Sequence, residues 1–128
     1  MQFNCLANCT IGALICSLTL FFACKSDPKM DAAQLLGQWK GSAWMVFDKP
    51  ADRDASAVNF TFEAGDKYTA TYSEQQEKGV YRLEGNKLYT TAENKIEKMV
   101  KILRLNSDSL VFEMNRTGQE EKLILLKK

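Results

Sequence analysis

Apolar and polar residues alternate with a period of two along most of this 128-residue chain, and the alternation begins at Gly37. In the first alternating segment, residues 37–48, Trp39, Met45 and Phe47 fall on one parity and Trp44 falls on the other. Successive side chains of a β-strand point to opposite faces of the sheet, so this spacing indicates a half-buried strand. We therefore expect Trp39, Met45 and Phe47 to face inward and Trp44 to face outward.

Seven further alternating segments follow, separated by short polar or glycine-containing turns. They are residues 58–64, 68–73, 79–83, 88–92, 96–105, 110–115 and 123–127. Residues 49–56 are polar and contain a proline, so we interpret them as a loop, and residues 30–36 as a short helix. No connection is long enough for a crossover helix, which makes an antiparallel meander the expected topology. The predicted fold is all-β, an eight-stranded barrel with a short N-terminal helix; a two-sheet sandwich is the alternative.

The first 23 residues have a different composition, because they contain no charged side chain. Residues 11–23, IGALICSLTLFFA, form an apolar run of 13 residues. That length is typical of the apolar region of a signal peptide, while a membrane-spanning helix needs about 20 residues. We interpret residues 1–23 as a signal peptide, with a retained transmembrane anchor as the alternative, and exclude them from the fold.

A small residue followed by cysteine, Ala23-Cys24, ends the apolar run. This arrangement resembles a bacterial lipobox, although Phe21 and Phe22 depart from its usual leucine and small residue. The resemblance implies that the Cys24 thiol carries diacylglycerol and the new amino terminus a fatty acid such as palmitate. Residues 24–31 would then be the lipidated cysteine and a polar tether, similar to the spacer in lipoproteins of Bacteroidetes-type bacteria. The expected location is the bacterial cell envelope, anchored to a membrane and more often the outer one.

Three short motifs in the alternating region occur in a recognisable order. They are Leu36-Gly37-Gln38-Trp39, then Gly79-x-Tyr81-x-Leu83-x-Gly85-Asn86-x-Leu88, then Leu103-x-Leu105-x4-Leu110. Together they resemble the small lipocalin-like domains of bacterial lipoproteins over residues 32–128. In lipocalins an arginine from a late strand stacks on the tryptophan of the first motif. This chain has no arginine after Arg116, so Lys122 or Lys127 would have to take its place.

Charge and residue types exclude several classes of function. The formal net charge is +1 and both signs are interspersed, which argues against a nucleic-acid partner. There is no histidine, and all four cysteines lie at or before Cys24, so we expect no metal site and no cofactor. The acidic residues Glu63, Asp66, Glu74 and Glu77 fall in or beside turns, as expected of a solvated surface. We predict a non-enzymatic protein with no catalytic residue.

Large aromatic residues on the alternating segments are the candidate ligand-binding residues. An eight-stranded barrel either fills its interior with side chains or leaves room for one small ligand. The aromatic candidates are Trp39, Phe60, Phe62, Tyr68, Tyr72 and Tyr81. One hypothesis is that they bind a small apolar or amphipathic molecule. The other is that they fill the core of a protein-interaction module of the cell envelope.

The last three predicted strands are apolar on both faces. Ile124 and Leu125, for example, are adjacent and must point to opposite sides of the sheet. We therefore expect a continuous apolar patch on the outer wall formed by these strands. The short helix would cover part of it, and a homo-oligomer or an envelope protein would cover the rest.

Overall fold

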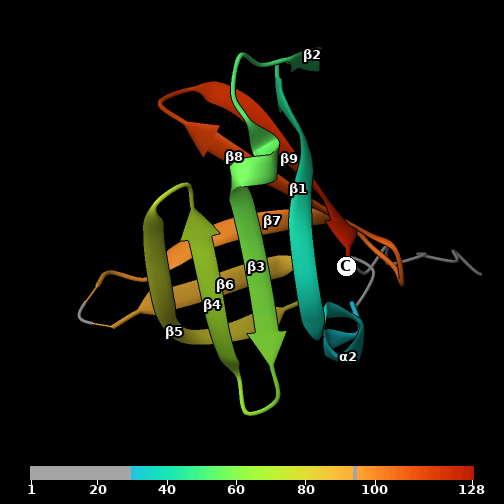
Figure 1. Cartoon of the computed structure of the whole chain (residues 1–128). Coiled ribbons are helices and arrows are strands. Elements are labelled where there is room, and N and C mark those ends of the chain that lie inside the picture. Colours follow the sequence, from blue (N-terminus) through green and yellow to red (C-terminus); the bar gives the residue numbers. More distant parts are fainter. Residues whose placement is uncertain (1–29, 94) are drawn as a thin grey trace, which may run out of the picture.

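The computed structural model describes residues 30–93 and 95–128, which form one short helix and a nine-stranded antiparallel sheet (Figure 1). The signal peptide and Cys24 lie outside the described residues. The elements are α2 (Ala32–Leu35), β1 (Gly37–Val46), β2 (Lys49–Pro50), the 3-10 turn η2 (Ala55–Ala57), β3 (Val58–Glu63), β4 (Lys67–Tyr72), β5 (Gln75–Glu84), β6 (Lys87–Ala92), β7 (Lys98–Leu105), β8 (Ser109–Arg116) and β9 (Gln119–Lys127).

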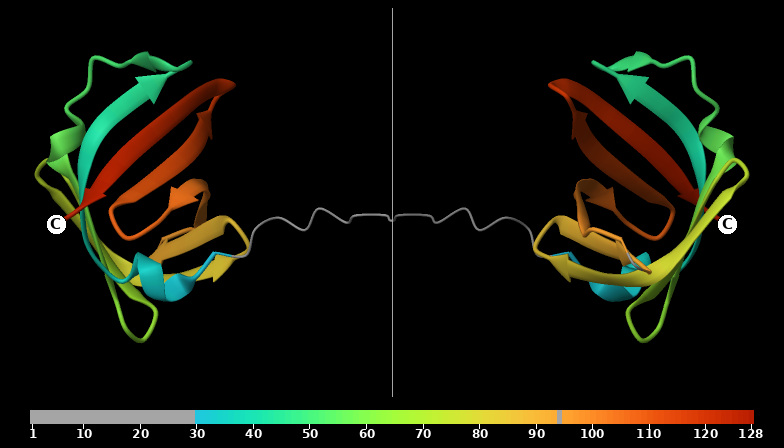
Figure 2. Two further views of the ribbon diagram at one scale, coloured as in Figure 1. Left: turned by 90° about the vertical axis from the view of Figure 1, so that its right-hand side faces the viewer. Right: turned by 90° about the vertical axis from the view of Figure 1, so that its left-hand side faces the viewer.

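The sheet closes on itself through its first and last long strands. From β3 onward each strand pairs with the next, β1 pairs with β3, and β1 also pairs with β9, where Trp39 is opposite Lys127 and Gly41 opposite Leu125. This confirms the eight-stranded barrel and excludes the sandwich (Figure 2). The prediction that residues 49–56 form only a loop is wrong, because the segment contains β2 and the first two residues of η2. Phe47 and Asp48 connect β1 to β2 with φ angles of 49° and 60°, as a two-residue hairpin turn requires.

One end of the barrel is closed by α2 and by Trp39. The Asp31 carboxylate accepts a hydrogen bond from the Ala33 amide and caps the helix, which delivers Leu35 to the core. The Trp39 side chain is 0 % exposed, and its Nε1 donates to the Leu35 carbonyl over 2.8 Å. The prediction that α2 covers the outer wall is therefore wrong, since its buried side chain enters the barrel core.

A lysine does occupy the position over the Trp39 ring. Lys127 Nζ lies 4.5 Å from the ring centroid and also donates to the Leu36 carbonyl. A cation over an indole face is attracted by the ring quadrupole, and the carbonyl adds a hydrogen bond to the same ammonium. The expectation that Lys122 or Lys127 replaces the lipocalin arginine is confirmed for Lys127.

A β-bulge in β1 reverses the parity that the sequence suggests. The pairing with β9 shifts between Gly41 and Ala43, and beyond the shift Trp44 is opposite the buried Leu123. Trp44 therefore packs against the core, whereas Phe47 is 60 % exposed in the turn. The predictions that Met45 and Phe47 face inward and Trp44 outward are wrong, because an extra residue in a strand moves every later side chain to the other face.

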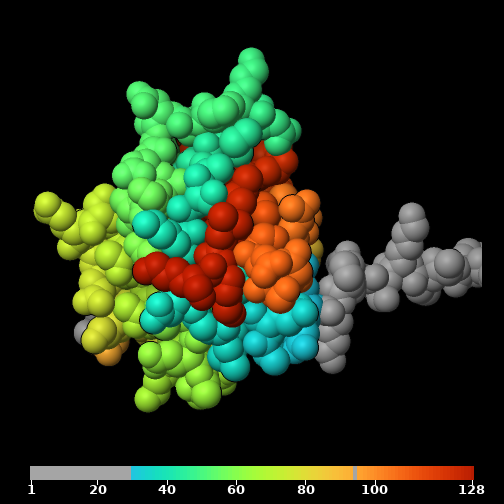
Figure 3. Space-filling view, turned by 45° about the vertical axis from the view of Figure 1, so that its right-hand side comes forward, coloured from blue at the N-terminus to red at the C-terminus, as the bar shows by residue number. Residues whose placement is uncertain are grey.

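The outer wall of β7, β8 and β9 carries apolar residues, as expected for strands whose sequence is apolar on both faces. Leu125 is fully buried, while Val111 and Ile124 are cross-strand partners on the opposite face. Near this pair Leu103 is 41 % exposed and Leu126 47 % exposed. Figure 3 looks onto the adjoining surface, where β9 in red crosses between β1 and the orange residues of β7 and β8. No helix within residues 30–93 and 95–128 reaches the length and apolarity needed to span a bilayer.

Candidate functional site

A cavity of about 580 Å³ opens at the end of the barrel away from α2. Its volume falls within the range of small-molecule sites, about 300–1,000 Å³. The lining comes from β1, β3, β4, β6, β7, β8 and β9. The lining residues are Trp44, Phe60, Tyr72, Leu88, Thr90, Lys98, Met99, Val100, Lys101, Phe112, Glu113, Met114, Asn115, Arg116 and Leu123.

The floor of the cavity is apolar and well packed. Phe60, Leu88, Phe112 and Leu123 are all buried, because strand alternation turns each of them inward. The Phe60 ring meets Phe112 edge-on at a centroid distance of 5.4 Å and Tyr72 edge-on at 5.8 Å. Such edge-to-face contacts are favourable beyond simple burial, so the floor is a fixed apolar surface.

The six candidate residues from the sequence divide between this cavity and the filled half of the barrel. Phe60 and Tyr72 line the cavity. Trp39, Phe62, Tyr68 and Tyr81 are buried in the core cluster, where Phe62 and Tyr81 are 5.1 Å apart. A ligand-binding role for all six stays a prediction, and only two of them lie where the cavity is.

Two lining features were not found by sequence reasoning. Trp44 reaches the cavity only because the β1 bulge turns it inward. The cations Lys98 and Arg116 also line the cavity, and the sequence analysis did not single them out. Their position in the lining depends on the pairing of β7 and β8 with their neighbours, which is a long-range property of the fold.

The ladder between β7 and β8 stops before the open end of the barrel. Among the described residues of these strands, the pairing ends with Lys101 opposite Glu113. Residues 98–100 pair only with β6, and residues 114–116 pair only with β9. In Figure 1 the two strands diverge at this end, and residues from both sides of the separation line the cavity. Besides its opening at the end of the barrel, the cavity therefore also opens sideways between β7 and β8.

A buried carboxylate and two guanidinium groups surround Trp44 at the rim. Glu121 is 1 % exposed, and its oxygens lie 3.1 Å from Arg53 Nη1 and 3.3 Å from Arg116 Nε. The same guanidinium carbons stand 5.1 Å and 5.8 Å from the Trp44 ring centroid. Two cations thus share one buried anion beside the cavity. The Trp44 Nε1 is buried and has no hydrogen-bond acceptor within the described part of the chain.

Burial favours the neutral form of Tyr72 in the cavity wall and of Tyr68 in the filled core. Burial, with a further contribution from the Glu77 carboxylate, raises the pKa of Tyr72 above its ordinary value of 10. The same two causes raise the pKa of Tyr68 to about 12. Both phenols therefore carry their protons at neutral pH and well above it.

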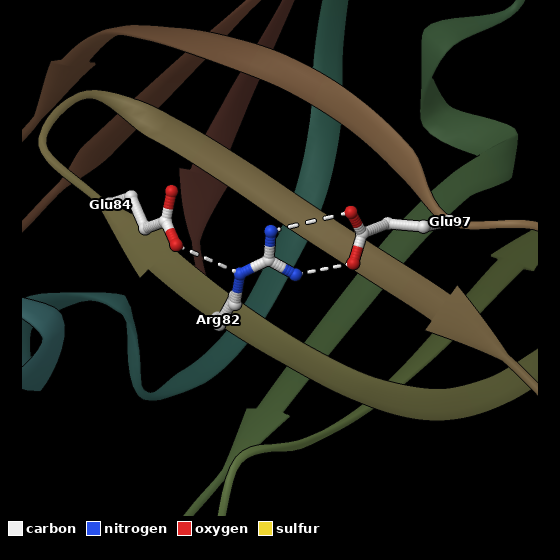
Figure 4. A network of polar contacts seen from close by, with 3 residues as sticks. All are labelled: Arg82, Glu84 and Glu97. Carbon is white, nitrogen blue, oxygen red and sulfur yellow. Dashed lines mark hydrogen bonds and ion pairs between the residues drawn. The ribbon is translucent and has the colours of Figure 1, made fainter.

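An ion-pair network fixes the segment that leads into β7 (Figure 4). Arg82 of β5 forms a fork with both oxygens of Glu97 and also binds Glu84 over 3.1 Å. Its guanidinium carbon lies 4.1 Å from the ring centroid of Tyr89, the cross-strand partner of Arg82 on β6. The Glu97 contacts raise the pKa of Arg82, which stays charged in any case. Because Lys98 follows Glu97 directly, the network also positions one side of the cavity mouth.

A second hollow of about 590 Å³ adjoins the cavity but is more open to solvent. Most of its lining is polar or charged, including Gln75, Gln76, Glu77 and Lys78. It lacks the apolar floor that a ligand of low polarity requires. No group of three or more acidic, cysteine or histidine side chains is placed to hold a metal ion in residues 30–93 and 95–128.

Comparison with known proteins agrees with the barrel. Residues 35–112 match the lipocalin-like domain family. A lipocalin-like protein from Bacteroides uniformis is similar in structure, with a TM-score of 0.58 and 19 % identity over 74 % of this chain and 99 % of that one. An uncharacterised protein from Bacteroides eggerthii gives a TM-score of 0.57 and 14 % identity over 73 % and 98 % of the two chains. A search of curated proteins found no match. Because the family match spans more than half of the sequence, the chain belongs to the lipocalin-like domain family.

Proposed function

We propose that this protein is a lipid-anchored member of the cell envelope that binds a small apolar or amphipathic molecule in the cavity at the open end of its barrel. The observation that carries the proposal is the cavity itself, with its volume of about 580 Å³ and its floor of Phe60, Phe112 and Leu123. Each methylene group buried on such a floor contributes about 0.8 kcal/mol. The polar rim would then orient the ligand.

The ligand hypothesis is tested by filling the cavity. Val100 is an inward residue of the lining, so Val100→Trp should occupy part of the space and weaken binding of the neutral fluorescent probe N-phenyl-1-naphthylamine by about tenfold, equal to 1.4 kcal/mol. The matched control is Val80→Trp, because Val80 is exposed on β5. Equal probe affinity in the wild type and both variants, or no probe binding by the wild type, would contradict ligand binding in this cavity.

The anchoring proposal rests on Ala23-Cys24 at the end of the apolar run. In cells given an alkyne analogue of palmitate, the wild-type chain should be labelled and recovered with membranes. Cys24→Ser should lose the label, because the serine hydroxyl does not accept the diacylglycerol that the thiol accepts in lipoproteins. Cys16→Ser, a change inside the apolar run, should be labelled like the wild type. Equal labelling of the Cys24→Ser variant would contradict the lipoprotein assignment.

A second candidate function is a protein-interaction module. It is favoured by the exposed Leu103 and Leu126 beside Val111 and Ile124 on the outer wall. An apolar patch of this kind often meets another protein or a second copy of the chain. This candidate predicts that sedimentation velocity detects an oligomer or a stable complex. It also predicts that Val100→Trp leaves this association unchanged. If the wild type sediments as a monomer and Val100→Trp loses probe binding, the interaction module is contradicted and ligand binding is supported.

A further inference from the structure

Two register shifts lie on the same row of the sheet. One is the bulge in β1 that immediately precedes Ala43, and the other is a shift in β7 that immediately precedes Arg104. The row runs across β1, β9, β8 and β7 through the successive partners Ala43, Ile124, Val111 and Arg104. An extra residue bends the strand that carries it. The two outer strands of this group of four are therefore bent at one level of the barrel.

Toward the open end, part of this group has no ladder to the rest of the barrel on either side. On one side, β1 pairs with β3 only as far as Lys40. On the other side, the β7–β8 ladder ends with Lys101 opposite Glu113. Within the group, β8 still pairs with β9, β9 with β1, and β1 with β2. We call this part, residues 43–50 and 114–122, the flap; it lies at the top of the molecule in Figure 1.

The ion pairs of the flap are internal to it or reach only the segment that follows β2. Glu121 pairs with Arg116 inside the flap and with Arg53, three residues past β2. Lys122 pairs with Asp48 over 2.6 Å, and both belong to the flap. Among the described residues, no ion pair or side-chain hydrogen bond joins the flap to β4, β5, β6 or β7. The flap could therefore move against those strands as a unit without breaking any of these bonds.

The two walls on either side of the sideways opening have free strand edges. Residues 98–100 of β7 pair only with β6, and residues 114–116 of β8 pair only with β9. In antiparallel pairing, each step along one strand moves one step back along the other. Continuing the ladder past its present end would therefore place Met99 opposite Asn115. The backbone groups on these two edges are complementary, as in any antiparallel pair.

Charge compensation on each wall would limit the repulsion between them on closure. The continued register would place Lys98 opposite Arg116, and like charges opposite each other destabilise a ladder. However, Glu77 lies 3.4 Å from Lys98, and Glu121 lies 3.3 Å from Arg116. Each cation is thus compensated by a carboxylate on its own side of the opening.

We propose that the flap is a gate on the cavity. It pivots at the row of the two register shifts, and in its closed arrangement the β7–β8 ladder extends past Lys101 and Glu113 and shuts the sideways opening. A hinge needs only a few backbone positions to change, and Ser42 and Leu103 are the residues at which the ladders already slip. This inference rests on the proposed function, because it states how a ligand of the cavity enters and leaves.

A disulfide across the opening tests whether the flap closes. Met99 and Asn115 are exposed, so cysteines at both positions leave the core intact. Paired Cα atoms of an antiparallel ladder stand about 4.5–5.5 Å apart, within the reach of a disulfide. In the full-length protein treated with copper phenanthroline, Met99→Cys/Asn115→Cys should oxidise about tenfold to a hundredfold more slowly than Lys101→Cys/Glu113→Cys, the last pair of the present ladder, as expected of a minor closed state. The control is Val80→Cys/Asn115→Cys, which should not cross-link, because Val80 is exposed on β5.

The release of N-phenyl-1-naphthylamine tests whether the flap acts as a gate. The fall of probe fluorescence after rapid dilution gives the rate at which the probe leaves the cavity. In the oxidised Met99→Cys/Asn115→Cys protein this rate should be about tenfold lower than in the same protein after reduction, because the locked flap blocks the exit. The wild type exposed to the same oxidant should release the probe at its usual rate. The four native cysteines all lie at or before Cys24, so peptide mapping identifies the new disulfide.

The outcomes separate the gate from the proposed function. If Met99→Cys/Asn115→Cys oxidises no faster than the Val80 control, the flap does not close and the inference is wrong. If the disulfide forms and probe release is unchanged, the opening between β7 and β8 is not the ligand's route and the gate is again wrong. If the disulfide forms but the wild type binds no probe, the ligand-binding function fails and the gate with it, whereas the pivoting of the flap is supported.

Discussion

Replacing Trp39 by alanine is expected to lower the free energy of unfolding by about 3–5 kcal/mol, the range for deleting a large buried aromatic side chain. The indole is fully buried, and three separate contacts depend on it. Its Nε1 binds the Leu35 carbonyl, its face lies under Lys127, and its ring packs against the core at the closed end. Removing the indole would open a cavity. It would also remove the contacts that hold α2 and the end of β9 at the closed end of the barrel. Urea denaturation followed by circular dichroism measures the loss.

The matched comparison is Trp44→Ala. Trp44 is only partly buried and lines a cavity that already exists, so its removal should cost about half as much or less, in proportion to the buried area lost. Trp44→Ala should also weaken ligand binding, whereas Trp39→Ala, where it remains folded, should not. Equal stability losses in the two variants would show that the closed end is not held by Trp39.

Adding a single methyl group at Gly41 is expected to destabilise the barrel by about 3 kcal/mol, the upper end for overpacking a core. A Cβ at this position would stand 1.9 Å from the Ala55 carbonyl oxygen, and backbone atoms of η2 have little freedom to retreat. Gly41 lets η2 lie against β1 at the point where the strand begins to bulge. Thermal unfolding monitored at several wavelengths would record the loss.

Gly65→Ala is the control for Gly41→Ala. A Cβ at Gly65 would meet no atom within 4 Å, although its φ of +84° strains any L-residue by about 1–2 kcal/mol. The Gly65 variant should therefore be the more stable of the two. A Gly41 variant with wild-type stability would mean that η2 does not pack where the structure places it.

The strand pattern could be predicted because it is local. Each segment with a period of two became a strand, and the turns at Gly65, Gly85 and Gly118 all adopt the positive φ that favours glycine. The substitution of Lys127 for the lipocalin arginine could also be anticipated, since few cations follow Arg116.

The bulge in β1 could not be predicted, because its cause lies elsewhere in the chain. β1 departs from β3 after Lys40, the carbonyl of Ala55 approaches Gly41, and the pairing with β9 slips at Ser42. None of this alters the alternation within β1 itself. As a result, the sequence misplaces Trp44, Met45 and Phe47 together.

The candidate site could be predicted only in part, for a geometric reason. Alternation separates inward from outward residues, but it does not say how far along the barrel axis each one lies. Phe60 and Phe62 share a face, yet one lines the cavity and the other belongs to the filled half. Lys98 and Arg116 become neighbours only when the β7–β8 register is known.

The pairing of the first long strand with the last has a consequence for synthesis. Until β9 leaves the ribosome, β1 and β8 both have free edges, and Trp39 lacks the lysine that lies over its ring. At about 5–20 residues per second, the chain spends several seconds as a partial sheet that has no way to close. The nine residues of β9 therefore decide when the barrel can close. A nascent chain that stalls just before β9 would expose two unpaired strand edges, which can pair with the edges of other chains.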